Sequence, residues 1–269
     1  MPIEQSDHQR NGLDRRAFLG LGGAALAGAV LTACATDGST HDATPDRSTT
    51  SSSRASTSAT SGTPVAVLTA ADFDAAGTCR LVPEKTAGPF PLDRQFDRRD
   101  VTEGLPGQPL RLGLRVVDAH CTPVRGAAVE IWHCDATGDY SAFRDNGGGK
   151  DAAAGTTFLR GTQSTAADGI VEFATLYPGW YRGRAVHIHL RVHREGATVL
   201  TSQLFFPDDY TDEVYTAAPY ARFGTSDTRN AQDSIAGDPK TEGTLLTVRA
   251  ADTGRGSGTL ALVNLGISA

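Results

Sequence analysis

The 269-residue sequence predicts an all-β fold, either a β-sandwich or a barrel. Thirty glycines, thirteen prolines and a scarcity of long apolar helical patterns favour strands and turns over helices. Short runs in which apolar and polar residues alternate recur at fairly regular spacing, which is typical of both architectures. Roughly two hundred residues belong to this folded part, which is enough for one sizeable core.

The N-terminus has the pattern of an export signal. Arg15 and Arg16 precede an apolar run, 17–33, whose short length and many Gly and Ala residues suit a signal peptide better than a spanning helix. The arginine pair resembles a twin-arginine signal, and the small residues before Cys34 resemble a lipobox. We therefore expect residues 1–33 to be a twin-arginine/lipoprotein signal peptide. A lipid on Cys34 would then anchor the chain to the cell membrane on its extracytoplasmic side. An N-terminal anchor that is never cleaved is the alternative.

Residues 34–64 are expected to form a disordered linker. They are mostly Ser, Thr, Ala, Asp and Gly, and so little apolar surface cannot offset the entropy lost on ordering. The linker would hold the folded domain, residues 65–269, away from the membrane.

Charge and cysteine content narrow the partners and the compartment. The formal net charge is −6 with no basic stripe, which argues against nucleic-acid binding. Beyond Cys34, the sequence contains Cys79, Cys121 and Cys134, and an exported protein can form a disulfide. Three pairings are possible. We favour Cys79 with Cys121, because both lie at the margins of strand-like segments.

The domain is expected to contain eight strands. Residues 110–118 alternate in polarity, 121–126 are rich in turn residues and 127–133 are again extended, so a hairpin is expected here. The later strand-like runs are 158–163, 169–175, 186–193, 199–206, 245–250 and 259–265. Two stretches rich in Gly, Asp and Ala, 140–157 and 207–243, are expected to be long loops. Loops of this length in a compact domain are often functional.

The strand-like run 186–193 has the strongest chemical signal. Its apolar residues alternate with polar ones and would face the core, so His187 and His189 would project together from the opposite face. Two imidazoles at that spacing can bind one metal ion at the edge of a sheet. Taken alone, the pair is explained equally well as two surface or hydrogen-bonded histidines.

Three segments, taken in order, resemble a known family. They read VVDAHCTPVRGAAVEIWHCDATGDYS, YPGWYRGRAVHIHLRV and TSQLFFPDD. Together they resemble the intradiol ring-cleavage dioxygenases, which include the catechol 1,2-, hydroxyquinol 1,2- and protocatechuate 3,4-dioxygenases. The resemblance covers roughly residues 79–250. It implies a β-sandwich core with long active-site loops.

The resemblance also implies roles for particular residues. It assigns the ligands of a non-haem Fe(III) ion to Tyr140, Tyr181, His187 and His189. Among these, Tyr181 would give way to the substrate and take its proton. Arg184 would stabilise negative charge that develops on the ring, and Gln203 would line the substrate pocket. The expected reaction is intradiol cleavage of a catecholic substrate by O2 to a cis,cis-muconate-type diacid. Independently, phenolate oxygen and imidazole nitrogen are donors that suit iron.

The chain departs from the family pattern in three places. Phe90, in a T-x-G-P-[FY] segment, stands where many members have tyrosine. Tyr181 and His187 are closer in sequence than in several members, and we expect no dedicated N-terminal helical dimerisation region. The substrate's ring substituents and the oligomeric state are therefore left open.

The sequence is also compatible with two other functions and with structural roles for some of the candidate residues. The same sandwich can serve as a non-catalytic surface lipoprotein that binds a carbohydrate or a protein. A zinc hydrolase is a third hypothesis, which predicts carboxylate or cysteine ligands. Among single residues, Tyr140 and Tyr181 can be ordinary packing residues. Trp132 is expected in the core, because it ends an apolar strand.

Overall fold

The computed structural model describes residues 65–77, 80–143 and 155–268. The expected signal peptide (1–33), the expected linker (34–64), Cys34 and Cys79 lie outside these residues. Across the described part of the chain, no helix combines the length and apolar character needed to cross a membrane.

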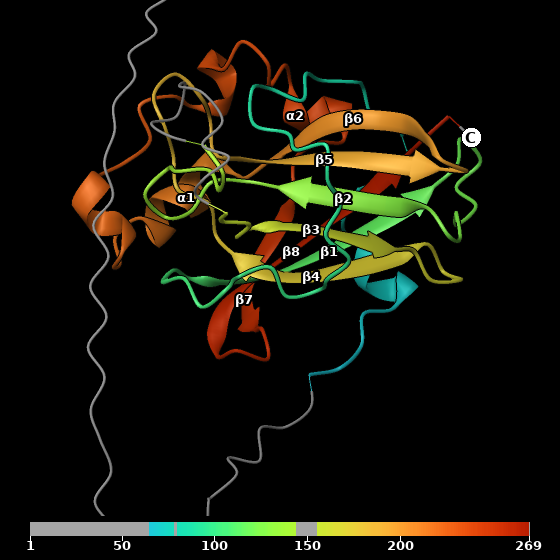
Figure 1. Cartoon of the computed structure of the whole chain (residues 1–269), viewed down its shortest axis with the longest axis horizontal. Helices are drawn as coiled ribbons and strands as arrows, with labels where there is room; N and C mark the ends of the chain where they lie inside the picture. The colour runs from blue at the N-terminus through green and yellow to red at the C-terminus, as the bar shows by residue number, and fades with distance from the viewer. Residues whose placement is uncertain (1–64, 78–79, 144–154, 269) are drawn as a thin grey trace, which may run out of the picture. The chain divides into compact units, whose positions relative to one another are not determined.

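Eight strands form two four-stranded sheets packed face to face, so the all-β prediction and the β-sandwich are confirmed (Figure 1). One sheet has the order β4-β1-β8-β7 and the other β3-β2-β5-β6. All eight predicted strands are present within a few residues. Their bounds are β1 Pro109–Val117, β2 Ala128–Trp132, β3 Arg160–Ser164, β4 Ile170–Leu176, β5 His187–Arg194, β6 Ala197–Phe205, β7 Thr247–Asp252 and β8 Ser257–Gly266.

The predicted hairpin between the first two strands is wrong, because β1 and β2 lie in different sheets. β1 pairs antiparallel with β4 and parallel with β8 near the C-terminus. β2 pairs antiparallel with β3 and with β5. The turn-rich stretch after β1 therefore carries the chain from one layer of the sandwich to the other. A local turn signal cannot distinguish such a crossing from a hairpin, since both need the same turn residues.

The core lies between the sheets and follows the alternation seen in the sequence. Leu112 and Leu114 of β1 are fully buried against Ile188 and Leu190 of β5 and against Val263 of β8, in one apolar cluster. Because successive side chains on a strand point to opposite faces, His187 and His189 lie on the outer face of the β3-β2-β5-β6 sheet. That outer face is also covered, since both histidines are buried.

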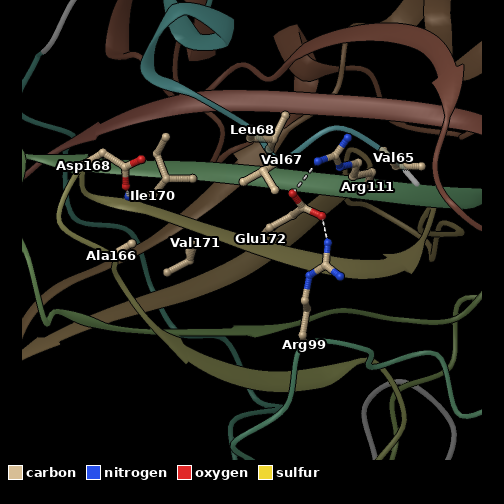
Figure 2. Close-up of a pocket in the computed structure, with 10 residues that line it drawn as sticks. All are labelled: Val65, Val67, Leu68, Arg99, Arg111, Ala166, Asp168, Ile170, Val171 and Glu172. Atoms are coloured by element: carbon tan, nitrogen blue, oxygen red, sulfur yellow. Dashed lines mark hydrogen bonds and ion pairs between the residues drawn. The ribbon is translucent and has the colours of Figure 1, made fainter. Parts of the chain in front are cut away.

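The outer face of the other sheet is covered by the start of the described chain. The short 3-10 helix η1 (Ala70–Phe73) packs Phe73 onto this face together with Leu68 and Leu262. Beside it lies a hollow of about 360 Å³ (Figure 2). There Glu172 pairs with both Arg99 and Arg111, so the hollow contains compensated charge and none of the predicted site residues.

The stretch 207–243, expected to be a loop, contains four short helices. They are α1 Asp208–Val214, η2 Tyr220–Phe223, η3 Asn230–Gln232 and α2 Pro239–Glu242. Each is at most seven residues long. Helices this short depend on tertiary packing rather than on a periodic sequence pattern, which is why the sequence did not reveal them.

Two of the cysteines lie within the described residues. Cys134 is buried and free, and burial raises the pKa of its thiol. Cys121 is disulfide-bonded. The preferred pairing with Cys79 stays a prediction, because Cys79 lies outside the described residues.

Leu114→Ala tests the core. This side chain is fully buried, and truncating such a leucine removes packing and leaves a cavity, so unfolding should become easier by about 2–5 kcal/mol. Denaturant unfolding of the full chain measures this. The control is Val67→Ala, because Val67 is 83% exposed and its loss should change stability by less than about 0.5 kcal/mol. Equal effects of the two substitutions would contradict the assignment of the core.

Candidate metal centre

The two histidines predicted as metal ligands meet on the outer face of β5. Their Nε2 atoms are 3.1 Å apart. The Tyr181 hydroxyl lies 3.2 Å from Nε2 of His187. The Tyr140 ring centroid is 5.8 Å from that of Tyr181 and 6.0 Å from that of His189. β5 lies between β2 and β6, so the site is on a sheet face and not at the sheet edge that the sequence suggested.

Both imidazoles are neutral in this environment. Burial, with a smaller contribution from the positive charge of Arg184, lowers the pKa of His187 to about 3. Burial likewise moves the pKa of His189 well below its usual value, with His187 the next cause. His187 Nδ1 lies 2.6 Å from the carbonyl oxygen of Ala185, so Nδ1 donates its proton there and Nε2 keeps a lone pair, which the Tyr181 hydroxyl contacts. This is the tautomer that a metal-binding histidine adopts.

Both phenols are protonated without a cation beside them. Burial raises the pKa of Tyr181 to about 12, although Arg184 opposes the shift. The pKa of Tyr140 is raised well above its usual value, again chiefly by burial. The Tyr140 hydroxyl is buried and makes no hydrogen bond of normal geometry, although the nearby Tyr181 hydroxyl contributes to raising its pKa. Because an unpartnered buried hydroxyl costs free energy, its position indicates a ligand that the protein itself does not supply.

Aromatic side chains line the site and stack on two of the candidate ligands. The indole of Trp132 stacks on the His189 imidazole, with centroids 5.0 Å apart and an angle of 4°. Phe90 stacks on Tyr140 at 4.1 Å and 15°. Trp132 is fully buried, as expected, but it packs in a cluster separate from the main core, with Phe90, Cys134 and Tyr140. The signal was present in the sequence: if Ile131 faces the core, its neighbour on the strand faces the other way.

The segment that contains Phe90 passes close over His189. At Gly88, with φ +69°, an added Cβ would lie 3.1 Å from Cε1 of His189. Glycine is therefore required both by the left-handed backbone and by the close approach to the imidazole.

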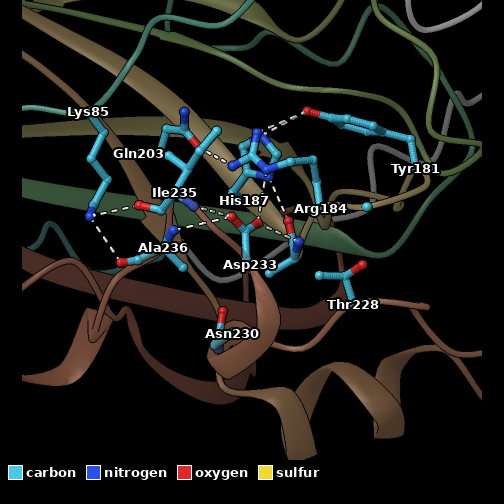
Figure 3. A network of polar contacts seen from close by, with 12 residues as sticks. Lys85, Tyr181, Arg184, His187, Gln203, Thr228, Asn230, Asp233, Ile235 and Ala236 are labelled. Atoms are coloured by element: carbon cyan, nitrogen blue, oxygen red, sulfur yellow. Dashed lines mark hydrogen bonds and ion pairs between the residues drawn. The ribbon is translucent and has the colours of Figure 1, made fainter.

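Arg184 and Gln203, both predicted as site residues, lie close to His187 (Figure 3). The Arg184 NH1 group is 3.5 Å from the Tyr181 hydroxyl, and its NH2 group donates to Oε1 of Gln203. Gln203 is the cross-strand neighbour of His189 and is fully buried. The six predicted site residues are thus brought together, and none is left apart.

The sequence analysis missed Asp233, which contacts Arg184. Its carboxylate accepts from Arg184 Nε at 2.9 Å and from the backbone N–H of Ala185 at 2.7 Å. Although burial raises its pKa, backbone N–H donors and Arg184 outweigh this effect and lower it overall. Asp233 follows η3, in the stretch expected to be a loop, and no motif marked it as different from the other acidic residues there.

The donors present fit a ferric ion. In the described part of the chain, no three His, Cys, Asp or Glu side chains lie close enough together to bind a metal, so the two histidines need donors of another kind. The Nε2 atoms of the two histidines, 3.1 Å apart, are close enough for both imidazoles to bind one ion. Phenolate and imidazole together suit iron. The buried Tyr140 hydroxyl and the unprotonated Nε2 of His187 agree with this donor set.

Comparison with known proteins finds that this chain is similar to dioxygenases. A family model described as "Dioxygenase" matches residues 87–237. The solved intradiol ring-cleavage dioxygenase from Tetranychus urticae is 31% identical with a TM-score of 0.64, and the match covers 71% of this chain and 95% of that chain. Chlorocatechol 1,2-dioxygenase of Rhodococcus opacus is 30% identical over 123 residues, which are 39% of this chain and 46% of that protein.

A third relative is the protocatechuate 3,4-dioxygenase beta chain of Burkholderia cepacia. It is 32% identical over 145 residues, 49% of this chain and 60% of that protein. The chain therefore spans about half the length of these two curated relatives.

Tyr140→Phe tests the ligand assignment. Losing even an outer group of a metal site costs roughly 10–100-fold in affinity, so iron affinity should fall at least tenfold. The metal-free variant should be no less stable than metal-free wild type, because the hydroxyl removed has no partner. Iron content by mass spectrometry and thermal unfolding of both forms measure these effects.

The control is Tyr177→Phe. Tyr177 is also fully buried, but its hydroxyl bonds Thr211 at 2.8 Å within the main core. This variant should keep its iron and lose stability. Full iron binding by Tyr140→Phe would show that Tyr140 is not a ligand.

Proposed function

Because the chain belongs to the intradiol ring-cleavage dioxygenase family, we propose that it cleaves a catechol-type ring between its two hydroxylated carbons with O2, giving a cis,cis-muconate-type diacid. The observation that carries this proposal is the gathering of two phenols and two neutral imidazoles on one buried sheet face.

The residues that would hold Fe(III) are Tyr140, Tyr181, His187 and His189. Two phenolates and two neutral imidazoles would leave one positive charge, which suits an anionic catecholate. Ferric iron bound there would supply the Lewis acid and electron acceptor that make a catecholate reactive toward O2. The raised phenol pKa values mean that the tyrosines lose their protons only when a cation takes their place.

The chain's own residues can bind and orient the substrate. Tyr181 is only partly buried, whereas Tyr140 is fully enclosed, so Tyr181 is the phenol that a substrate can reach. Its oxygen can take a proton from a substrate hydroxyl. The Arg184 NH1 group, 3.5 Å from that oxygen, places a fixed positive charge where the ring acquires negative charge. Phe90 and Trp132 hold Tyr140 and His189 in place by stacking.

Turnover of a substrate panel tests the proposal. Full-length protein loaded with iron should show a tyrosinate-to-Fe(III) absorption band in the visible range that shifts on adding catechol. Product analysis with catechol, protocatechuate and hydroxyquinol should then give intradiol diacids from at least one ring. An extradiol product would contradict the proposed reaction. A colourless protein that takes up no iron would favour the non-catalytic sandwich instead.

We also propose that the protein is exported and anchored to the membrane by a lipid on Cys34. The twin arginines and the small residues before Cys34 support this. In a bacterial host with a twin-arginine pathway, Cys34→Ser should release the domain from the membrane fraction, and replacing Arg15 and Arg16 with lysine should keep it in the cytoplasm. If the Cys34→Ser protein stayed in the membrane fraction, an uncleaved N-terminal segment, and not a lipid on Cys34, would be the anchor.

A further inference from the structure

We propose that Asp233 is a positioning residue that aims the Arg184 guanidinium at the Tyr181 hydroxyl. The inference rests on the proposed function, because it assigns how the arginine of that site is held. Asp233 reaches the site from a stretch 49 residues further along the chain, and its side chain is fully buried.

Both carboxylate oxygens of Asp233 are occupied. Oδ2 accepts from Arg184 Nε at 2.9 Å and from the Ala185 N–H at 2.7 Å. Oδ1 accepts from the N–H groups of Ile235 at 2.8 Å and Ala236 at 3.2 Å. One oxygen therefore binds the functional segment, while the other fixes the carboxylate to its own loop. A carboxylate held on both sides has little freedom to move with the arginine.

The guanidinium is oriented at two of its three nitrogens. Asp233 holds Nε, and Oε1 of Gln203 accepts from NH2. Gln203 cannot present its amide nitrogen instead, because that nitrogen donates to the Thr86 carbonyl at 2.7 Å. Since the guanidinium is planar, fixing Nε and NH2 also fixes NH1, which lies 3.5 Å from the Tyr181 hydroxyl.

The loop that contains Asp233 is held from a second side. Lys85, whose side chain is 7% exposed, donates to the carbonyls of Ile235 at 3.0 Å and Ala236 at 2.9 Å (Figure 3). It also pairs with Glu242 at 2.6 Å. With Lys85 in place, the loop has its own anchor, so Asp233 is not the sole tie between the loop and the sandwich. This leaves the contact with Arg184 as the distinctive contribution of Asp233.

The pair also balances charge. Arg184 and Asp233 are both largely buried, and a buried guanidinium without a counter-charge is costly. Without Asp233, the arginine would be repelled by a cation at the neighbouring ligands and would gain by turning toward solvent. Asp233 therefore favours the inward orientation energetically as well as geometrically.

Asp233→Asn in the iron-loaded full chain tests this. The matched control is Asp227→Asn, because the Asp227 carboxylate also ties this stretch to the same turn, through the Gly183 N–H at 3.1 Å, but no hydrogen bond joins it to Arg184. We expect Asp233→Asn to keep one iron per chain, the visible band and a catechol Kd, from spectral titration, within about threefold of wild type. Its kcat should fall by roughly 10–100-fold, as for loss of a charged hydrogen bond. The control should stay within about twofold.

Coupling to Arg184 separates positioning from a plain structural role. If Asp233 acts through Arg184, Asp233→Asn combined with Arg184→Lys should be about as slow as Arg184→Lys alone. Multiplied losses in the double variant, or wild-type kcat in Asp233→Asn, would overturn the inference. If wild-type protein cleaves no ring at all, the proposed function fails instead.

A readout without turnover is the crystal structure of Asp233→Asn, in which the guanidinium should have left the Tyr181 hydroxyl. An unmoved guanidinium would overturn the inference. Should Asp233→Asn not fold, Asp233→Asn with Arg184→Met decides the matter. If the double variant folds, the result supports the pairing of Asp233 with Arg184. If the double variant also fails to fold, Asp233 is needed to hold its own loop, and the inference is rejected.

Discussion

The site depends on two neutral imidazoles, His187 and His189, whose Nε2 atoms are held 3.1 Å apart on the outer face of β5. Imidazoles are exposed to water on most outer strand faces and can then be charged at mildly acidic pH. Here burial keeps both neutral, and the Ala185 carbonyl accepts the Nδ1 proton of His187, so that Nε2 keeps its lone pair. The rest of the site follows from the need to cover this pair.

The cover comes from segments far apart in the sequence. The segment with Gly88 and Phe90 passes over His189 and stacks on Tyr140, and Trp132 lies flat against His189. The stretch after η3 adds Asp233. Each of these contacts satisfies a polar group or shields it from water, and together they make a buried face out of what sheet geometry alone would leave exposed.

Much of this was readable from the chain. All eight strands follow from alternation and turn residues, and the four candidate ligands follow from the motifs that resemble the family. The hairpin between β1 and β2 was not correct, because β1 pairs with β4 and the distant β8, while β2 lies in the other sheet. The short helices of 207–243 could not be predicted from the sequence, because their stability comes from tertiary packing. Trp132 is buried as expected, but on the outer side of its strand, because alternation turns it away from Ile131.

By itself, the sequence determined the strand periodicity, the side of β5 on which His187 and His189 project, and the donor types that suit iron, because these depend on residue identity and local spacing. Tertiary structure alone decided that this face is buried, that Tyr140 lacks a protein partner, and that Asp233 meets Arg184 from 49 residues away. Burial and long-range contacts depend on how distant segments pack, and no local pattern in a single chain encodes which acidic residue of a loop will turn inward.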